Sequence, residues 1–143
     1  MIFVLDTNVL SALIAAEFPP AVGGWVAARE KPTLFTTTVC QAEILSGLVV
    51  MPPGRRRSAL LQAAQTMFLR RFEGRVLGFD VAAAIAYADI HGLRRSAGHP
   101  LSMADTMIAA IARVHNATVV TRNVRDFDGC GVEVVNPWDA PVT

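Results

Sequence analysis

The sequence predicts an α/β fold in which short, mostly parallel strands alternate with helices. Of the 143 residues, 52% are hydrophobic and only 17% are charged, against about 25% charged in an average domain. This composition excludes intrinsic disorder and gives enough apolar surface for a core and a subunit interface. Short apolar runs also alternate along the chain with segments of helical periodicity, as in parallel sheets covered by helices.

The first strand is expected at residues 2–5, because Ile-Phe-Val-Leu is apolar throughout and ends at an acid. Apolar residues at helical spacing follow over residues 7–16. Pro19 and Pro20 end that helix and begin another. The apolar face of this second helix consists of Val22, Trp25 and Val26.

A second strand is expected at residues 34–37, with a helix directly after it. Thr38 and Gln41 fit a capping box at the start of this helix, and the Met-Pro-Pro-Gly turn at 51–54 ends it. Residues 55–72 form a long amphipathic segment. Its apolar stripe consists of Leu60, Leu61, Ala64, Met67 and Phe68.

The second half of the chain predicts a brief third strand at 76–77 and an alanine-rich helix at 81–95, with Gly98 as its stop. The remaining elements are a helix at 102–115 and strands at 118–121 and 132–135. The residues of the last helix expected to face inward are Met103, Met107, Ile108, Ile111 and Ala112. We expect one domain over 1–143, since the sequence contains no repeat or linker.

Charge and cysteine content exclude several classes of protein. The net charge is +1, from 13 basic and 12 acidic residues, which argues against binding nucleic acid by bulk charge. Cys40 and Cys130 lack zinc-site spacing and are interpreted as ordinary thiols, although a disulfide between them stays possible. The longest apolar stretch, 81–88, is far shorter than the roughly 20 residues of a membrane span. With no signal peptide recognisable, we expect a cytoplasmic protein without membrane contact.

Polar residues gather where the predicted strands end, and ligands of open parallel sheets bind beyond those carboxyl ends. These residues are Asp6, Thr7 and Asn8 after the first strand, Glu43 on the helix after the second, Asp105 in the first turn of the helix at 102–115, and Thr121, Arg122, Asn123 and Asp126 at and after the strand at 118–121.

Each of these residues has a structural explanation when taken alone. Asp6 could cap the following helix, and Asp105 suits the first turn of its helix. Glu43 could be a solvated helix residue, and Asn123 and Asp126 could be turn residues. Convergence weakens these explanations, because carboxylates in one crevice raise one another's pKa unless a cation neutralises them. Carboxylate oxygens select Mg²⁺ or Mn²⁺.

A divalent ion at such a site can lower the pKa of a bound water and stabilise charge on a phosphate oxygen. The chain has no Walker-type loop, no Gly-x-Ser-x-Gly elbow and no Cys/His pair of the usual spacing. Metal-assisted hydrolysis of a phosphodiester is therefore the favoured chemistry. Arg122 is the candidate for binding a substrate phosphate through paired hydrogen bonds.

Four segments in order resemble the PIN-domain ribonuclease toxins of type II toxin–antitoxin pairs. They are IFVLDTNVL at the start, TVCQAEI around Glu43, LSMADTMIAAIA around Asp105, and TVVTRNVRDF at 118–127. The separations also match, with 37 residues from Asp6 to Glu43 and 62 from Glu43 to Asp105. The late Asn-Pro-Trp at 136–138 resembles the VapC- and FitB-type subgroup, and the resemblance covers essentially the whole chain.

The resemblance implies a three-layer α/β/α sandwich with a Mg²⁺ or Mn²⁺ site at Asp6, Glu43 and Asp105. It also implies endoribonuclease activity, a homodimer, and neutralisation by a VapB- or FitA-like antitoxin in a larger assembly that reaches DNA only through the antitoxin. The chain departs from many relatives at Asn123, where they have a fourth Asp. Asn brings no charge, which disfavours a second metal, and the nearest acid is Asp126.

The leading hypothesis is a Mg²⁺-dependent ribonuclease toxin that cleaves RNA. In it Asp6 and Asp105 bind the metal, and Glu43 binds it through water or activates the attacking water. The residues expected to hold these carboxylates in place are Thr7, Asn8 and Thr121. We expect the antitoxin groove on the helices at 7–29 and 55–72, where apolar residues lie beside arginines.

Two alternatives belong to other classes. A haloacid-dehalogenase-type phosphatase needs Asp-x-Asp after the first strand, where this chain has Asp-Thr-Asn, and a receiver domain needs a late lysine, where the only lysine is Lys31. The other alternative is a non-catalytic interaction protein of the same fold within a DNA-bound repressor complex.

Overall fold

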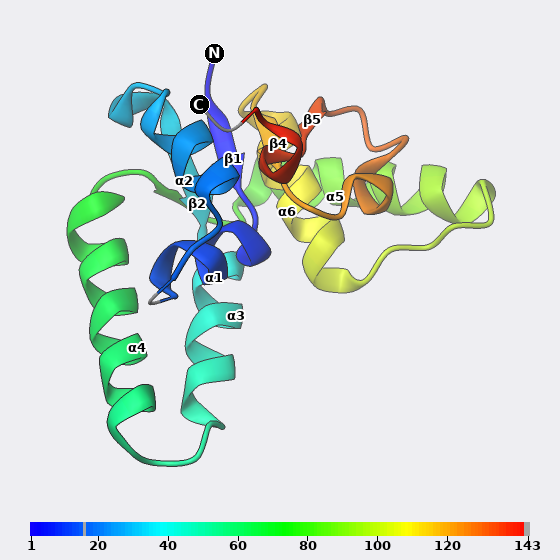
Figure 1. Ribbon diagram of the computed structural model, residues 1–143. Helices are drawn as coiled ribbons and strands as arrows, with labels where there is room; N and C mark the ends of the chain where they lie inside the picture. The colour runs from blue at the N-terminus through cyan, green and yellow to red at the C-terminus, as the bar shows by residue number, and fades with distance from the viewer. Residues whose placement is uncertain (16, 142–143) are drawn as a thin grey trace.

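A computed structural model describes residues 1–15 and 17–141 (Figure 1). Five strands form one sheet in the order β3-β2-β1-β4-β5, and each pair of neighbours in it is parallel. The strands are β1 Phe3–Leu5, β2 Leu34–Thr37, β3 Val76–Leu77, β4 Thr118–Val120 and β5 Val134–Val135. The predicted α/β class with a parallel sheet is confirmed.

The register of the central strands places the ends of distant segments side by side. Leu5 at the end of β1 pairs with Val120 at the end of β4, so Asp6 and Thr121 follow at the same edge. The backbone N–H of Asp6 continues the ladder by donating to the carbonyl of Val120 at 2.9 Å. On the other side of β1, the Thr36 hydroxyl donates to the carbonyl of Leu5 at 2.8 Å. Hydrogen bonds to both neighbouring strands therefore fix the end of β1 at the carboxyl edge of the sheet.

In the part of the chain that the structure describes, six α-helices flank the sheet (Figure 1). They are α1 Thr7–Ile14, α2 Pro20–Ala27, α3 Thr38–Val49, α4 Arg55–Thr66, α5 Val81–Ser96 and α6 Met103–Val114. Figure 1 shows α3 and α4 running side by side away from the sheet, with α5 and α6 on the other side of the molecule. Within the described ranges, no helix is long and apolar enough to cross a membrane.

The core lies between the sheet and the helices and is built mainly from β1, β4 and α6. The run from Ile108 to Ala112 of α6 is completely buried, and its alanines let the helix approach the sheet closely. The largest buried side chains elsewhere are Leu5, Leu10, Phe72, Ile90 and Phe127. Burying one such side chain stabilises the fold by roughly 1.5–3 kcal/mol.

The predicted long helix at 55–72 is α4 followed by a wider π-helical turn, Met67–Arg71. Ala64, Met67 and Phe68 of its predicted stripe are buried. Gly98 follows α5 with φ +76°, a left-handed conformation that glycine adopts without a Cβ penalty. Cys40 and Cys130 are both buried and free, so no disulfide joins them.

The start of α3 differs from the prediction, because Thr37 caps this helix. Thr37 keeps an extended backbone, and its hydroxyl oxygen accepts from the Cys40 N–H at 3.0 Å. Thr38 is already the first helical residue, so the predicted capping box of Thr38 and Gln41 is wrong. The reason is non-local: Thr37 pairs with Leu77 of β3, which fixes where the strand ends.

The start of α6 holds a second difference, since Met103 was expected inside and is 70% exposed. Met103 is the first helical residue, directly after the Ser102 cap. This first turn lies at the carboxyl edge, beyond the cover of the strands. The later inward residues, from Ile108 onward, are buried as predicted.

Candidate active site

Asp6 lies at the end of the central strand and is 96% buried, with 4% of its surface exposed. One carboxylate oxygen accepts from the Thr7 N–H at 2.8 Å, which caps α1. The other accepts from the Thr121 hydroxyl at 2.8 Å and from the Asn8 amide at 3.4 Å. Asp6 therefore caps the helix and also presents a buried carboxylate at the edge of the sheet.

Burial raises the pKa of Asp6 to about 6. The hydrogen bonds from Thr121 and Thr7 act against this rise, whereas the negative charges of Asp105 and Glu43 add to it. Charges of buried or partly buried groups are screened only weakly by salt, so acids at the same edge act on one another. The structure thus brings three acids from separate segments to one edge of the sheet.

Glu43 extends from α3 to the start of α1. Its Oε1 accepts from the Thr7 hydroxyl at 2.7 Å. Thr7 therefore contacts two acids at once, donating its backbone N–H to Asp6 and its hydroxyl to Glu43. This places Glu43 beside Asp6, although it lies 37 residues further along the chain.

Asp105 lies in the first turn of α6, where the Ser102 hydroxyl caps the helix by accepting from the Asp105 N–H at 3.1 Å. Burial raises the pKa of Asp105, a hydrogen bond with Ser102 lowers it, and the charges of Asp126 and Glu43 raise it further. Asp126 is half-buried in the 3-10 turn Val124–Phe127. A fourth carboxylate therefore lies in the electrostatic range of Asp105.

Asn8 joins the first helix to the loop after β4. Its amide donates to the Thr121 hydroxyl at 3.0 Å, and its carbonyl oxygen accepts from the Arg122 N–H at 3.1 Å. The Thr121 hydroxyl also accepts from the backbone N–H of Asn123 at 3.1 Å. The predicted positioning residues thus form one network around Asp6, while the Asn123 side chain is exposed.

The residues fit a hard divalent cation. Across residues 1–15 and 17–141, no three His, Cys, Asp or Glu side chains lie close enough to form a ready-made ion cage. Mg²⁺ does not need such a cage, because it keeps several waters and takes one or two carboxylates directly. Its charge would offset the burial and the neighbouring negative charges that raise the pKa values of Asp6 and Asp105.

Two contacts at the site were missed by the sequence analysis. The Cys40 thiol lies 4.0 Å from an Asp6 carboxylate oxygen, and burial together with the Asp6 charge raises the pKa of Cys40 to about 11. The Arg122 guanidinium lies 5.1 Å from the centre of the Trp138 ring. The pattern of polar residues at strand ends predicts Arg122 as a site residue. That pattern does not indicate which aromatic ring lies beside Arg122, so the contact with Trp138 was missed.

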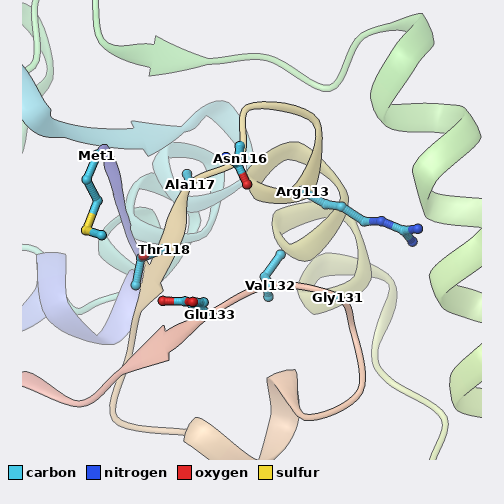
Figure 2. Close-up of a pocket in the computed structure, with 8 residues that line it drawn as sticks. All are labelled: Met1, Arg113, Asn116, Ala117, Thr118, Gly131, Val132 and Glu133. Atoms are coloured by element: carbon cyan, nitrogen blue, oxygen red, sulfur yellow. The ribbon is translucent and has the colours of Figure 1, made fainter.

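The opposite edge of the sheet also has a hollow, of about 440 Å³ (Figure 2). Met1, Thr118 and Glu133 lie on one side of it. Figure 2 shows the Arg113 side chain extending away from this hollow, and its guanidinium lies 3.7 Å from Asp89 of α5. This amino-edge hollow has a single acid on its lining, so convergence of acids is a property of the carboxyl edge.

Comparison with known proteins agrees with this arrangement. The PIN domain family model matches residues 3–129. The VapC ribonuclease Y4jK of Sinorhizobium fredii is 38% identical over 95% of this chain and 97% of its own. The plasmid stability protein StbB of Pseudomonas syringae pv. tomato is likewise 38% identical over 95% of this chain and 98% of its own.

Solved structures give the same result. The crystal structure of FitAcB from Neisseria gonorrhoeae has a chain with a TM-score of 0.89 and 30% identity, covering 96% of this chain and 99% of that one. The toxin FitB of the same organism is 31% identical over 94% of this chain and 96% of its own. Sequence and fold agree over nearly the whole length, and the chain belongs to the PIN-domain family, among its VapC- and FitB-type members.

Proposed function

We propose that the protein is the toxin of a type II toxin–antitoxin pair, a Mg²⁺-dependent endoribonuclease neutralised by a VapB- or FitA-like antitoxin. Its PIN-domain membership makes it a nuclease that acts on phosphodiester bonds. The observation that carries the metal dependence is the buried Asp6 carboxylate, which Thr7 joins to Glu43 and on which the charge of Asp105 acts. Mn²⁺ satisfies the same ligands.

Each acid has a separate role in this proposal. Asp6 and Asp105 would hold the ion, which when bound would lower the pKa of a water and neutralise charge at the phosphate. Glu43, held by the Thr7 hydroxyl, orients that water or accepts its proton. Arg122 binds a phosphate oxygen, since a guanidinium forms paired, charge-assisted hydrogen bonds with phosphate.

The fourth acid of the site is Asp126 in this proposal, because Asn123 has no charge to offer. Asp126 contributes to the raised pKa of Asp105, so it is close enough to share the ion's field. Asn123 is exposed, and its backbone N–H is bonded to Thr121. Asn123 would therefore contribute a hydrogen bond to water or substrate, and one metal suffices.

A groove beside Glu43 supports the antitoxin interaction. It measures about 700 Å³ and is lined by residues of α1, α3 and α4, and Figure 1 shows α3 and α4 running side by side. Its lining includes Ile14, Ile44, Leu48, Leu60 and the cationic Arg56. An apolar groove with a cation suits an amphipathic antitoxin segment. In this assembly a homodimer of the toxin reaches DNA only through the antitoxin.

Cleavage of RNA by the purified full-length protein tests the proposal. We expect products with Mg²⁺ or Mn²⁺, none with EDTA, and none from Asp105→Asn in any of these buffers. Circular dichroism confirms that the variant is folded. Cleavage that persists in EDTA or in folded Asp105→Asn would overturn the metal mechanism. Failure of the parent protein to cleave any RNA would favour the interaction protein of the same fold.

A further inference from the structure

A second hollow at the carboxyl edge begins where the acidic site ends. It measures about 620 Å³, and its lining includes Arg122, Arg125, Asp126, Asn136 and Asp139. Asp126 belongs to both regions, since its charge acts on Asp105. A substrate strand crossing the acids therefore continues directly into this hollow.

Arg122 is held in place at both ends. Its backbone N–H donates to Asn8, which in turn donates to Asp6 and Thr121. Its guanidinium lies 5.1 Å from the Trp138 ring centre, within the range of a cation–π attraction. This contact leaves the guanidinium N–H groups available to an anion, because the ring face offers no conventional hydrogen-bond acceptor.

Trp138 is itself fixed by its own turn. The 3-10 turn Pro137–Asp139 is capped by Asn136, whose side-chain oxygen accepts from the Trp138 N–H at 2.9 Å. Pro137 of this turn is buried. The ring under Arg122 is therefore part of a packed element, and the position of Arg122 relative to the acids is set before any substrate binds.

Positive and negative side chains lie at different distances from the acidic site within the hollow. Arg122 and Arg125 supply positive charge next to the acidic site, whereas Asp139 supplies an exposed carboxylate beyond them. A phosphate is attracted to the arginines and repelled by Asp139. A carboxylate instead accepts hydrogen bonds from amino and imino groups on a base edge, and the donors of the Watson–Crick edge are free only in an unpaired nucleotide.

We propose that this hollow holds one unpaired nucleotide of the substrate RNA next to the cleaved bond. Arg122, supported by Trp138, binds the phosphate of this nucleotide, and Asp139 contacts the edge of its base. The inference rests on the proposed function, since it deepens the substrate side of the same site. It predicts a preference for guanine, whose N1–H and amino group are adjacent donors that one carboxylate accepts together.

A second Arg–Trp pair provides a matched control. Arg29 lies 4.0 Å from the Trp25 ring centre and 5.7 Å from that of Phe3. Phe3 begins β1, whereas Asp6 follows its other end, so this pair lies about three residues, roughly 10 Å, along the strand from the acids. The same chemistry is therefore present away from the proposed RNA path.

The test measures RNA binding separately from cleavage. We would use Trp25→Phe/Asp105→Asn protein, in which Trp138 is the sole remaining tryptophan of the two in the chain, with a mixed-sequence 12-nucleotide RNA in Mg²⁺. We expect RNA to change Trp138 fluorescence, and the single-stranded form to bind more tightly than a duplex of the same sequence. Adding Arg122→Ala should weaken binding about tenfold, while adding Arg29→Ala, which removes an arginine beside the phenylalanine now at position 25, should leave it unchanged.

Base recognition is measured on the catalytic protein by sequencing its cleavage sites. Asp139→Asn should reduce an enrichment of guanine at one position flanking the cut and leave the other positions unchanged. In the same assay Arg122→Ala should mainly raise KM, and Arg122→Lys should recover part of the loss.

Two results would overturn the inference. One is unchanged RNA affinity in Arg122→Ala, and the other is RNA binding that leaves Trp138 fluorescence unaffected. Gels of the binding samples separate these failures from failure of the proposed function. Cleavage by the Asp105→Asn protein would contradict the metal mechanism. If that protein does not cleave RNA and Arg122→Ala leaves its RNA affinity unchanged, only the proposed nucleotide-binding hollow is contradicted.

Discussion

The two edges of the sheet are built from the same strands and differ in chemistry. At the carboxyl edge, Asp6 is buried, hydrogen-bonded to Thr7 and Thr121, and close enough to Asp105 and Glu43 for its pKa to rise. At the amino edge, a hollow of about 440 Å³ has a single acid, Glu133, on its lining (Figure 2). The difference shows that the strand order and strand direction of this fold bring the acids to one edge of the sheet.

Helix direction gives the physical reason. In a parallel sheet the helices begin at the carboxyl edge and end at the amino edge, so α1 and α3 begin where β1 and β2 end. Helix N-termini carry partial positive charge and unpaired N–H groups, which stabilise carboxylates. Asp6 caps α1, and Asp105 lies in the first turn of α6. Structural capping and the proposed catalysis therefore use the same residues.

The substitution with the largest expected effect on RNA cleavage lies at the carboxyl edge, and a matched substitution at the amino edge serves for comparison. Asp6→Asn should lower RNA cleavage at least about 1000-fold, because it removes a direct metal ligand and its charge. It should also abolish growth inhibition when the toxin is expressed without its antitoxin. The matched substitution at the amino edge, Glu133→Gln, should leave both unchanged. Cleavage rates with a defined single-stranded RNA measure the two variants.

Circular dichroism and thermal unfolding supply the control for this comparison, since Asp6→Asn must remain folded for the loss to be meaningful. Full cleavage by a folded Asp6→Asn protein would refute the assignment. A comparable loss in Glu133→Gln would show that the amino edge takes part in the reaction.

The loop after β4 sharpens the comparison within the carboxyl edge. Asp126→Asn should lower kcat/KM about 10–100-fold, because it removes a carboxylate whose charge acts on Asp105, as outer-shell substitutions at metal sites do. Asn123→Asp should restore part of this activity in the Asp126→Asn background by adding a negative charge three residues away. Kinetics at several Mg²⁺ concentrations test whether the loss is in metal affinity. Unchanged kinetics in Asp126→Asn would show that Asp126 takes no part in the reaction and that the acidic site consists of Asp6, Glu43 and Asp105.

The sequence was sufficient for the strands and the helix order, because each of these depends on local pattern. An apolar run that ends in a carboxylate marks the end of β1 and the cap of α1 at Asp6, whereas the roles of the acids stay predictions. The details that failed depend on distant contacts. Thr37 caps α3 because its strand pairs with β3, and no local pattern distinguishes it from Thr38.

The polar network shows the same limit. Thr7 was expected to hold a carboxylate, but its bond to Glu43 joins residues that lie 36 apart. The Asn8–Thr121 bond spans 113 residues. Pairings of this kind follow from strand order and register, which helical and strand periodicities do not specify.

Stability gives the next comparison, in the metal-free protein. The pKa of Asp6 is about 6 in the folded state against an ordinary value of 3.8. The folded state therefore binds more protons between these values, and stability falls as pH rises through about 4 to 6. Asp6→Asn removes this penalty. We therefore expect the free energy of unfolding of the variant to be about 2 kcal/mol higher than that of the parent protein at pH 7.5. The gain should be nearly absent at pH 4.

Chemical denaturation in EDTA at both pH values measures this difference. Mg²⁺ should stabilise the parent at pH 7.5 and have little effect on Asp6→Asn, because the ion binds the folded state through that carboxylate. Glu133→Gln should follow the parent at each pH. A variant that is less stable than the parent at pH 7.5 would show that the hydrogen bonds of Asp6 outweigh its burial cost.

The smallest expected effect concerns how the carboxyl edge is held together. Asn8→Ala removes the bonds to Asp6, Thr121 and the Arg122 backbone without touching any charge. We expect kcat/KM to fall about tenfold and the Mg²⁺ concentration for half-maximal activity to rise, because partners of ligands tune metal affinity. Asn116→Gly at the amino edge deletes an equivalent amide at a residue with φ 52°, where glycine is unstrained, and should change neither quantity. Because a positioning role predicts that Mg²⁺ dependence shifts together with rate, a lower rate at unchanged Mg²⁺ dependence would assign Asn8 to substrate contact.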